Sequence, residues 1–302
     1  MSFEEIDNGI VRIRVAARGA ALCGFWHAGW ARSVVLGTDP PEAMLDAHPY
    51  AGAVVGPVAN RVTQGQVQIA GKHYAMPMNA PGACLHSGPD GLHARQWTLE
   101  TRGASLTAQV TLADGACGLP GNRRFQASYA LEKTCLTVTL EAWSDADTLC
   151  NLALHPYFNL DGTADLARHR LAVGGAQVLE TADGLPTGRT LPVQAVGLAP
   201  TLTAPHPGVD HNVCLTRAPA AVLTADAGPT LTIGTDAPGL QVYGGAGLPT
   251  VAGSLGAPIG PGAGLALEPQ MWPDAPHHAA FPSILLRASQ PWRQITTYHL
   301  DM

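Results

Sequence analysis

The sequence predicts an all-β protein, and two observations carry that prediction. The 302 residues include 34 glycines and 25 prolines, which separate short apolar–polar alternations rather than helical periodicities. Residues 106–112 and 136–142 alternate most clearly, and each run would present one apolar and one polar face, as a half-buried strand does. Asp-Gly dipeptides, which favour tight turns, lie between such runs at 90–91, 114–115, 161–162 and 183–184.

Nothing in the sequence divides the chain into parts. We find no shift in composition, no linker, no low-complexity segment and no fixed repeat, so we expect one all-β domain over residues 1–302. A hydrophobic content of 46% is ample for a large core. Few segments favour a helix, and residues 41–46 are one that could form a short helical turn.

Charge and cysteine usage limit the partners and the compartment. Lys and Arg total 17, the formal net charge is -6 and no basic run occurs, which argues against nucleic acid and anionic membranes as partners. We see neither a signal peptide nor an apolar run of membrane-spanning length, so we expect a cytoplasmic protein. The scattered cysteines are expected to be reduced and mostly buried: Cys23, Cys84, Cys117, Cys135, Cys150 and Cys214.

The stretch 264–274 places a carboxylate at the end of an apolar run. Leu265 and Leu267 are one strand period apart, which leaves Glu268 on the opposite face, and Pro269 is expected to end regular pairing. A carboxylate held against apolar surface loses hydration, so its pKa rises and it becomes a candidate general base. The plain alternative is a solvated carboxylate at a strand end.

Two stretches in the first third of the chain concentrate polar side chains. An apolar run at 52–62 ends in Asn60 and Arg61, and the planar guanidinium of Arg61 could bind a ligand oxygen or pair with a structural carboxylate. A glycine-rich loop at 84–93 is expected to expose His86 and a second histidine, although a loop histidine is commonly just solvated.

Two later stretches add a histidine and an aspartate. In 150–160, His155 follows a buried-looking strand and precedes a proline and two aromatic residues. Because histidine exchanges a proton near pH 7, His155 is the candidate acid that complements Glu268, and the alternative is a satisfied core histidine. In 207–213, within a proline-rich connection expected to begin near residue 186, Asp210 could bind hydroxyl groups or cap a turn.

Taken together, these stretches resemble the aldose 1-epimerase (galactose mutarotase) family, in that family's chain order and from about Tyr50 to the end. The blocks around His155 and Glu268 are the specific ones. The matches are 59–61 to the end of Gly-Arg-x-Ala-Asn-Arg-Ile, 85–88 to Leu-His-Gly-Gly, 151–160 to Asn-Leu-Thr-Asn-His-x-Tyr-Phe-Asn-Leu, 208–211 to Gly-x-Asp-His, and 267–274 to Leu-Glu-x-Gln-x-x-Pro-Asp.

The resemblance implies a fold, an activity and a set of roles. The fold would be a large antiparallel β-sandwich, the galactose mutarotase-like supersandwich, with the sugar in an open cleft. His155 would be the acid towards the ring oxygen and Glu268 the base towards the anomeric hydroxyl. No metal or cofactor is implied, the partner would be a free monosaccharide, and the protein would be a monomer or homodimer. The implied substrate-binding residues are Asn60, Arg61, His86, Asp210 and Gln241.

The chemistry fits that pairing. Interconversion of α and β anomers needs removal of the proton from the C1 hydroxyl while the ring oxygen is protonated, followed by rotation about C1–C2 and reclosure. One base and one acid suffice. The chain shows no Gly-x-Ser-x-Gly, P-loop or dinucleotide-binding glycine pattern, which agrees with an acid–base isomerase.

The sequence also departs from the family, and alternatives stay open. Pro57, Ser87, His93 and Ala246 differ from the usual residues, and we expect these four changes to alter the cleft lining. A hexose-6-phosphate 1-epimerase would need clustered arginines for the phosphate. A glycosidase would use two carboxylates and leave His155 without a role. A non-catalytic sugar-binding protein on the same fold is the alternative outside enzymes.

Overall fold

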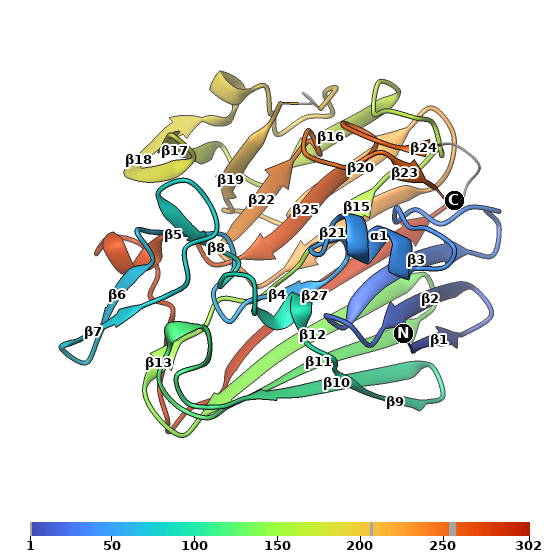
Figure 1. The fold of residues 1–302 in the computed structure, drawn as a ribbon. Coiled ribbons are helices and arrows are strands. Elements are labelled where there is room, and N and C mark those ends of the chain that lie inside the picture. The colour runs from blue at the N-terminus through green and yellow to red at the C-terminus, as the bar shows by residue number, and fades with distance from the viewer. Residues whose placement is uncertain (1, 206–207, 254–257) are drawn as a thin grey trace.

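The strands gather into two large antiparallel sheets (Figure 1). The computed structural model describes residues 2–205, 208–253 and 258–302. One sheet has eight strands and the other six, and the neighbouring strands in both run antiparallel. The predicted all-β, antiparallel architecture is confirmed.

The elements fall into two large sheets, smaller pairings and short helices. The eight-stranded sheet has the order β16 (His169–Val173), β20 (Ala221–Ala225), β21 (Thr230–Thr235), β27 (Trp292–Asp301), β12 (Cys135–Ser144), β11 (Arg123–Glu132), β10 (Ser105–Leu112) and β9 (Thr98–Arg102). The six-stranded sheet has the order β15 (Tyr157–Phe158), β25 (Leu265–Gln270), β22 (Gly239–Tyr243), β19 (Asp210–Cys214), β17 (Gln177–Ala182) and β18 (Leu185–Pro192). The smaller sheets are β1 (Phe3–Asp7), β2 (Val11–Ala16) and β3 (Ala21–His27), and the pairs β4 (Val54–Val55) with β14 (Ala153–Leu154), β5 (Arg61–Thr63) with β8 (Ala83–Leu85), β6 (Gln66–Ile69) with β7 (Lys72–Ala75), β13 (Thr148–Leu149) with β26 (Leu285–Leu286), and β23 (Val251–Ala252) with β24 (Pro258–Ile259). The helices are α1 (Glu42–Ala47) and the 3-10 turns η1 (Leu92–Ala94), η2 (Ala116–Gly118), η3 (Val193–Val196) and η4 (Ala275–His277).

The eight-stranded sheet follows the alternation in the sequence. The predicted runs 106–112 and 136–142 lie in β10 and β12, and buried residues alternate with half-exposed or exposed ones along both strands. Side chains of successive strand residues point to opposite faces, so one face of this sheet packs on the core and the other meets solvent. These two strand predictions are confirmed.

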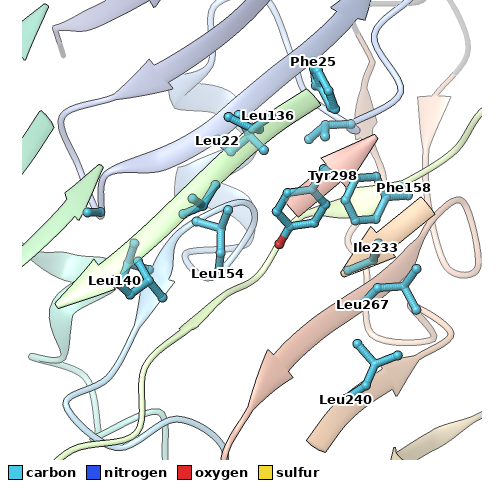
Figure 2. Close-up of a cluster of buried hydrophobic side chains, with 14 of the residues drawn as sticks. Leu22, Phe25, Leu136, Leu140, Leu154, Phe158, Ile233, Leu240, Leu267 and Tyr298 are labelled. Atoms are coloured by element: carbon cyan, nitrogen blue, oxygen red, sulfur yellow. The ribbon is translucent and has the colours of Figure 1, made fainter. Parts of the chain in front are cut away.

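The main core lies between the two large sheets. Figure 2 shows Leu136 and Leu140 of β12 on one side and Leu240 and Leu267 of the six-stranded sheet on the other, with Tyr298 between them. These side chains are at most 2% exposed. Each fully buried aliphatic side chain of this kind stabilises the fold by about 1.5–3 kcal/mol relative to an exposed one. The core therefore fixes how the six-stranded sheet lies on the eight-stranded one.

Strand β25, which lies between β15 and β22 in the six-stranded sheet, is buried along its whole length. In β25, Leu265 and Leu267 join the core, so Glu268 lies on the other face, as predicted. The expectation that Pro269 ends the pairing was wrong. The strand runs on to Gln270, with Pro269 opposite Leu240 in β22. Proline lacks the backbone N–H but keeps its carbonyl, which here accepts a hydrogen bond from the side-chain amide of Gln294 at 3.0 Å.

Other predictions can be checked element by element. The helical turn expected at 41–46 is present as α1, and the turn dipeptide 183–184 joins β17 to β18 with both residues at positive φ, as a tight hairpin turn requires. The proline-rich connection does not begin at residue 186, which lies inside β18 because prolines fit an edge strand. Pro207 lies outside the described residues.

All six cysteines are free, and four are buried. Among the described residues, no helix is long and apolar enough to span a bilayer.

Candidate active site

A cavity of about 190 Å³ opens on the face of the six-stranded sheet that points away from the core. All seven residues predicted for the site line it. The full lining consists of His48, Tyr50, Asn60, Arg61, Leu85, His86, His155, Tyr157, Asp210, Gln241, Tyr243 and Glu268.

Strand register explains how distant parts of the chain meet at this cavity. Glu268 of β25 lies directly opposite Gln241 of β22. The neighbouring row across the sheet runs from Tyr157 of β15 through Ala266 to Tyr243 and then to Asp210 at the start of β19. Residues directly opposite on paired strands share a face, so these two rows form the floor of the cavity.

His155 meets Glu268 at the centre of the cavity. It follows the short strand β14, and its backbone is held on both sides: its N–H donates to the Ala53 carbonyl, and its carbonyl accepts from the Gly52 N–H. Its Nε2 lies 3.4 Å from Oε1 of Glu268. The side chains are only 6% and 2% exposed, so both titrating groups are shielded from bulk water.

Burial moves both groups towards their neutral forms. The pKa of Glu268 is raised well above its usual range, first by burial and then by the charge of Asp210, while Arg61 opposes the shift. Burial also lowers the pKa of His155 to about 3, with a further contribution from His48. Both shifts favour the state in which the pair holds a single proton, on Glu268. Moving that proton from Glu268 to His155 produces a carboxylate base beside an imidazolium acid.

Two hydrogen bonds join Asn60 to His86, one between the backbones and one to the imidazole. The His86 N–H donates to the Asn60 carbonyl at 3.0 Å, and the Asn60 N–H donates to Nδ1 of His86 at 3.1 Å. Both residues have positive φ, a strained conformation that favours a functional role. Burial first, and the charge of His155 next, keep the pKa of His86 well below its usual value. Neutral His86 thus carries its proton on Nε2, as a hydrogen-bond donor.

The expectation that the 84–93 loop exposes two histidines was wrong. His86 is 5% exposed and His93 2%. Tyr50 lies between them, with ring centroids 4.7 Å from His86 and 4.6 Å from His93. The loop folds inwards because its rings pack on this tyrosine, a contact that no local pattern in the loop reveals.

Arg61, Asp210 and Gln241 form a linked group of complementary charge. Nε2 of Gln241 donates to Oδ1 of Asp210 at 2.6 Å, and the Arg61 guanidinium lies 3.7 Å from Oδ2 of the same carboxylate. The Arg61 side chain is 26% exposed and that of Asp210 39%, so both keep access to the cavity mouth. Such a mixture of fixed donors and acceptors suits a ligand rich in hydroxyl groups.

Sequence reasoning missed several lining residues. His48 and Tyr50 precede the 52–62 stretch, and Tyr157 and Tyr243 were read only as neighbours of His155 and Gln241. An aromatic residue one strand period after His155 is a usable signal for Tyr157, since such residues lie on one face. His48 comes from the end of α1, and its position depends on the tertiary fold.

Four residues depart from the family's usual ones, and none of them lines the cavity: Pro57, Ser87, His93 and Ala246. The expectation that they alter the cleft lining was wrong. Ser87 is fully buried, and its hydroxyl exchanges hydrogen bonds with the N–H and carbonyl of Val58 at 2.8 and 3.2 Å. His93 packs against the ring of Tyr50, which itself lines the cavity. Pro57 is buried and Ala246 is exposed.

No group of three or more His, Cys, Asp or Glu side chains arranged to hold a metal ion occurs in the described ranges. The paired histidines near the C-terminal 3-10 turn instead contact one carboxylate: Nδ1 of His277 lies 2.6 Å from Asp274. That aspartate also accepts hydrogen bonds from the backbone N–H and the hydroxyl of Thr63. This cluster fastens η4 to β5.

Comparison with known proteins agrees with this geometry. The family described as aldose 1-epimerase matches residues 4–299. Galactose mutarotase from Rattus norvegicus is 34% identical over 292 residues, covering 91% of this chain and 85% of the relative. Galactose mutarotase from Homo sapiens is 31% identical and covers 99% of this chain and 93% of its own. Aldose 1-epimerase from Escherichia coli K12 is 28% identical, with 89% and 85% covered.

Solved structures share the whole fold. An aldose epimerase homologue from C. elegans superimposes with a TM-score of 0.93 at 26% identity, covering 99% of this chain and 98% of that one. A galactose 1-epimerase from Lactobacillus acidophilus has the same fold, with a TM-score of 0.85 at 23% identity and coverage of 98% and 92%. The sandwich, its cleft and the family match over nearly the full length lead to one conclusion: this chain belongs to the aldose 1-epimerase family.

Proposed function

We propose that this protein is an aldose 1-epimerase that interconverts the α and β anomers of a free aldose, with His155 as general acid and Glu268 as general base. The observation that carries the proposal is the buried contact of 3.4 Å between Nε2 of His155 and Oε1 of Glu268, at the centre of a cleft lined by fixed donors and acceptors. The names of the similar proteins make galactose the first substrate to test.

The proposed reaction moves two protons and breaks one bond. Glu268 takes the proton of the anomeric hydroxyl, the C1–O5 bond breaks, and His155 gives its proton to the ring oxygen, so that a free aldehyde forms. Rotation about C1–C2 turns the other face of the carbonyl towards O5. On reclosure His155 recovers its proton from O5 and Glu268 returns one to O1. The pair ends with the single proton with which it began.

The remaining predicted residues are proposed to hold the sugar. Arg61 and Nε2 of His86 supply donors, and Asp210 supplies an acceptor whose other oxygen is occupied by Gln241. Asn60 fixes its neighbour by accepting the Arg61 N–H at 2.8 Å on its side-chain oxygen. Hydroxyl groups both donate and accept, so this alternation matches a monosaccharide better than a purely anionic or apolar ligand.

Two rival enzyme activities fit the cleft less well. Arg61 is the single Arg or Lys in its lining as described, whereas a phosphorylated sugar would need several. Asp210 and Glu268 could serve a glycosidase as a carboxylate pair, but then the histidine beside Glu268 would have no role. Release of p-nitrophenol from an aryl galactoside would revive the glycosidase alternative.

Polarimetry tests the proposal directly. Freshly dissolved α-anomers of galactose, glucose, arabinose, xylose and fucose are followed with and without the protein. We expect faster decay to the unchanged equilibrium rotation for at least one sugar, and the order of rates ranks the substrates. If no sugar in the panel is accelerated, the proposed activity on free aldoses is wrong.

A further inference from the structure

His48 reaches the cleft from outside the six-stranded sheet. It is the residue after α1, and its backbone N–H donates to the Met44 carbonyl at 2.7 Å. Its Nε2 lies 3.2 Å from the hydroxyl oxygen of Tyr157, with the two rings edge to face at 5.4 Å. The cluster that holds Tyr157 in place includes Met44 of α1 and Ile259 of β24. His48 is therefore fixed against Tyr157 by packing on both sides of the contact.

Tyr157 occupies a central position in the cleft floor. Its ring centroid is 5.1 Å from that of His155 and 6.2 Å from that of Tyr243. The two tyrosines can approach because the residue between them in the row is the small Ala266. Across the described residues, Nε2 of His48 is the one hydrogen-bond partner of the Tyr157 hydroxyl. The direction of that O–H bond thus depends on His48.

The protonation states define that direction. Burial lowers the pKa of His48 and raises that of Tyr157 well above its usual value, so both are neutral near pH 7. Nδ1 of His48 is buried with no hydrogen-bond partner in the described chain, so the contact of Nε2 with Tyr157 is the one hydrogen bond that the ring makes there. In the tautomer with the ring proton on Nδ1, Nε2 accepts and Tyr157 donates. The lone pair left on the tyrosine oxygen then faces the cleft.

We propose that His48 is a positioning residue that makes Tyr157 a hydrogen-bond acceptor for one hydroxyl group of the bound sugar. His48 does not touch the sugar in this scheme; it determines which way the Tyr157 O–H points. The sugar recognised at this position must carry a hydroxyl that donates to Tyr157. The proposal rests on the proposed mutarotase function, and it adds a residue outside the predicted site.

Three variants and a set of monodeoxy galactoses test it by polarimetry. H48F removes the imidazole nitrogens and keeps a ring of similar size, Y157F removes the hydroxyl, and H48Q keeps a polar group near the position of Nε2. We expect H48F and Y157F each to raise KM for galactose by about three- to tenfold with kcat within about twofold, as for one neutral hydrogen bond. The increase should disappear for the one monodeoxy sugar that lacks the recognised hydroxyl. H48Q should restore KM.

The double variant supplies the second readout. If His48 acts through Tyr157, the KM of H48F/Y157F should be no higher than that of Y157F alone, because Y157F has already lost the same hydrogen bond. As a matched control, Y129F removes a buried tyrosine hydroxyl that donates to the Ala20 carbonyl at 2.6 Å and does not line the cleft. Y129F should lower the melting temperature and leave KM unchanged for every sugar.

Different failures have different meanings. A wild-type protein that accelerates no sugar contradicts the proposed function itself. The positioning role is contradicted if the wild type is active but H48F raises KM equally for every monodeoxy sugar. It is also contradicted if the KM increases of H48F and Y157F multiply in the double variant. Either result would mean that His48 contributes only packing. If H48F does not fold, the Y157F profile and the H48Q rescue decide the question, and an unchanged KM in Y157F overturns the proposal.

Discussion

The two large sheets are built from similar strands but are buried differently. In the eight-stranded sheet, β11 and β12 alternate between buried and partly exposed residues along ten positions each. In the six-stranded sheet, all six residues of β25 are buried, as are four of the five in β22. One sheet has a core face and a solvent face. The other has a core face and a second face covered by the loops that build the site.

That second face contains polar groups that stability alone does not explain. Both polar atoms of the Gln270 side chain and both of the Asn212 side chain are buried without a hydrogen-bond partner in the described structure, and so is Oε2 of Glu268. An unsatisfied buried polar group costs about 1–3 kcal/mol. Unpartnered buried polar atoms also occur in the eight-stranded sheet, at Arg123, His169, Gln294 and Tyr298, but none of these residues lines the cavity. Glu268 does line it, so the six-stranded sheet accepts the cost of a buried carboxyl group at the position where the cleft has one.

The largest expected effect is on kcat, and it should occur for substitutions at the site on the six-stranded sheet but not on the eight-stranded sheet. We predict that Glu268→Gln and His155→Asn each lower kcat by about 100-fold or more, the usual contribution of a positioned base or acid, with circular dichroism unchanged. Glu141→Gln makes the same chemical change on β12, where the carboxylate contacts Gln126 and lies 3.9 Å from Arg293, and it should leave the rate unchanged. Near-normal turnover in either of the first two variants would contradict the assigned roles.

The next largest effect is on stability, with catalysis unchanged. Leu136 of β12 is fully buried in the main core, opposite Tyr298 of β27, so Leu136→Ala should lower the free energy of unfolding by about 2–5 kcal/mol. At a temperature where the variant remains folded, kcat and KM should match those of the wild type. Urea unfolding measures the free energy of unfolding, and polarimetry of the folded variant measures kcat and KM. A loss of kcat without a loss of stability would mean that the eight-stranded sheet also shapes the site.

The same contrast decides what the sequence could predict. Residues 106–112 and 136–142 lie in the sheet with one solvent face, and their period of two made them recognisable as strands. Strands buried on both faces lose that period. Glu268 was still assigned to the non-core face because two leucines at the strand spacing precede it, but the continuation of β25 through Pro269 was missed.

The site was predictable only as far as its residues carried motifs. All seven predicted residues line the cavity; six of them lie in stretches that match family motifs, and Gln241 of the run 239–243 was carried over with the family's roles. His48 and Tyr50 lie before or at the edge of those stretches, and their place in the cleft depends on how α1 packs against distant strands. The burial of His86 likewise depends on Tyr50, which is 36 residues earlier in the chain. Such long-range contacts leave no local pattern.

The smallest effect concerns stability and pH at the site itself. The pKa of Glu268 is raised in the folded protein, mainly by burial, so between the unfolded and folded values the folded chain keeps a proton that the unfolded chain has released. The stability associated with this group is complete below the unfolded pKa and is lost as the pH rises through the folded pKa. Glutamine cannot ionise, so Glu268→Gln removes this loss.

We therefore predict that Glu268→Gln, although inactive, is more stable than the wild type at pH 8 and gains less at pH 5. Each unit of pKa elevation is worth about 1.4 kcal/mol, and 1 kcal/mol moves the melting temperature by roughly 2 °C in a chain of this length. Thermal unfolding at the two pH values measures the gain. Glu141→Gln on the half-exposed β12 face should show no such gain, because its side chain is 23% exposed and stays open to solvent. An equal gain in both variants, or none in Glu268→Gln, would mean that the two sheets do not differ in the cost of burying a carboxylate. The site-bearing face would then be no less stable than the face built for packing.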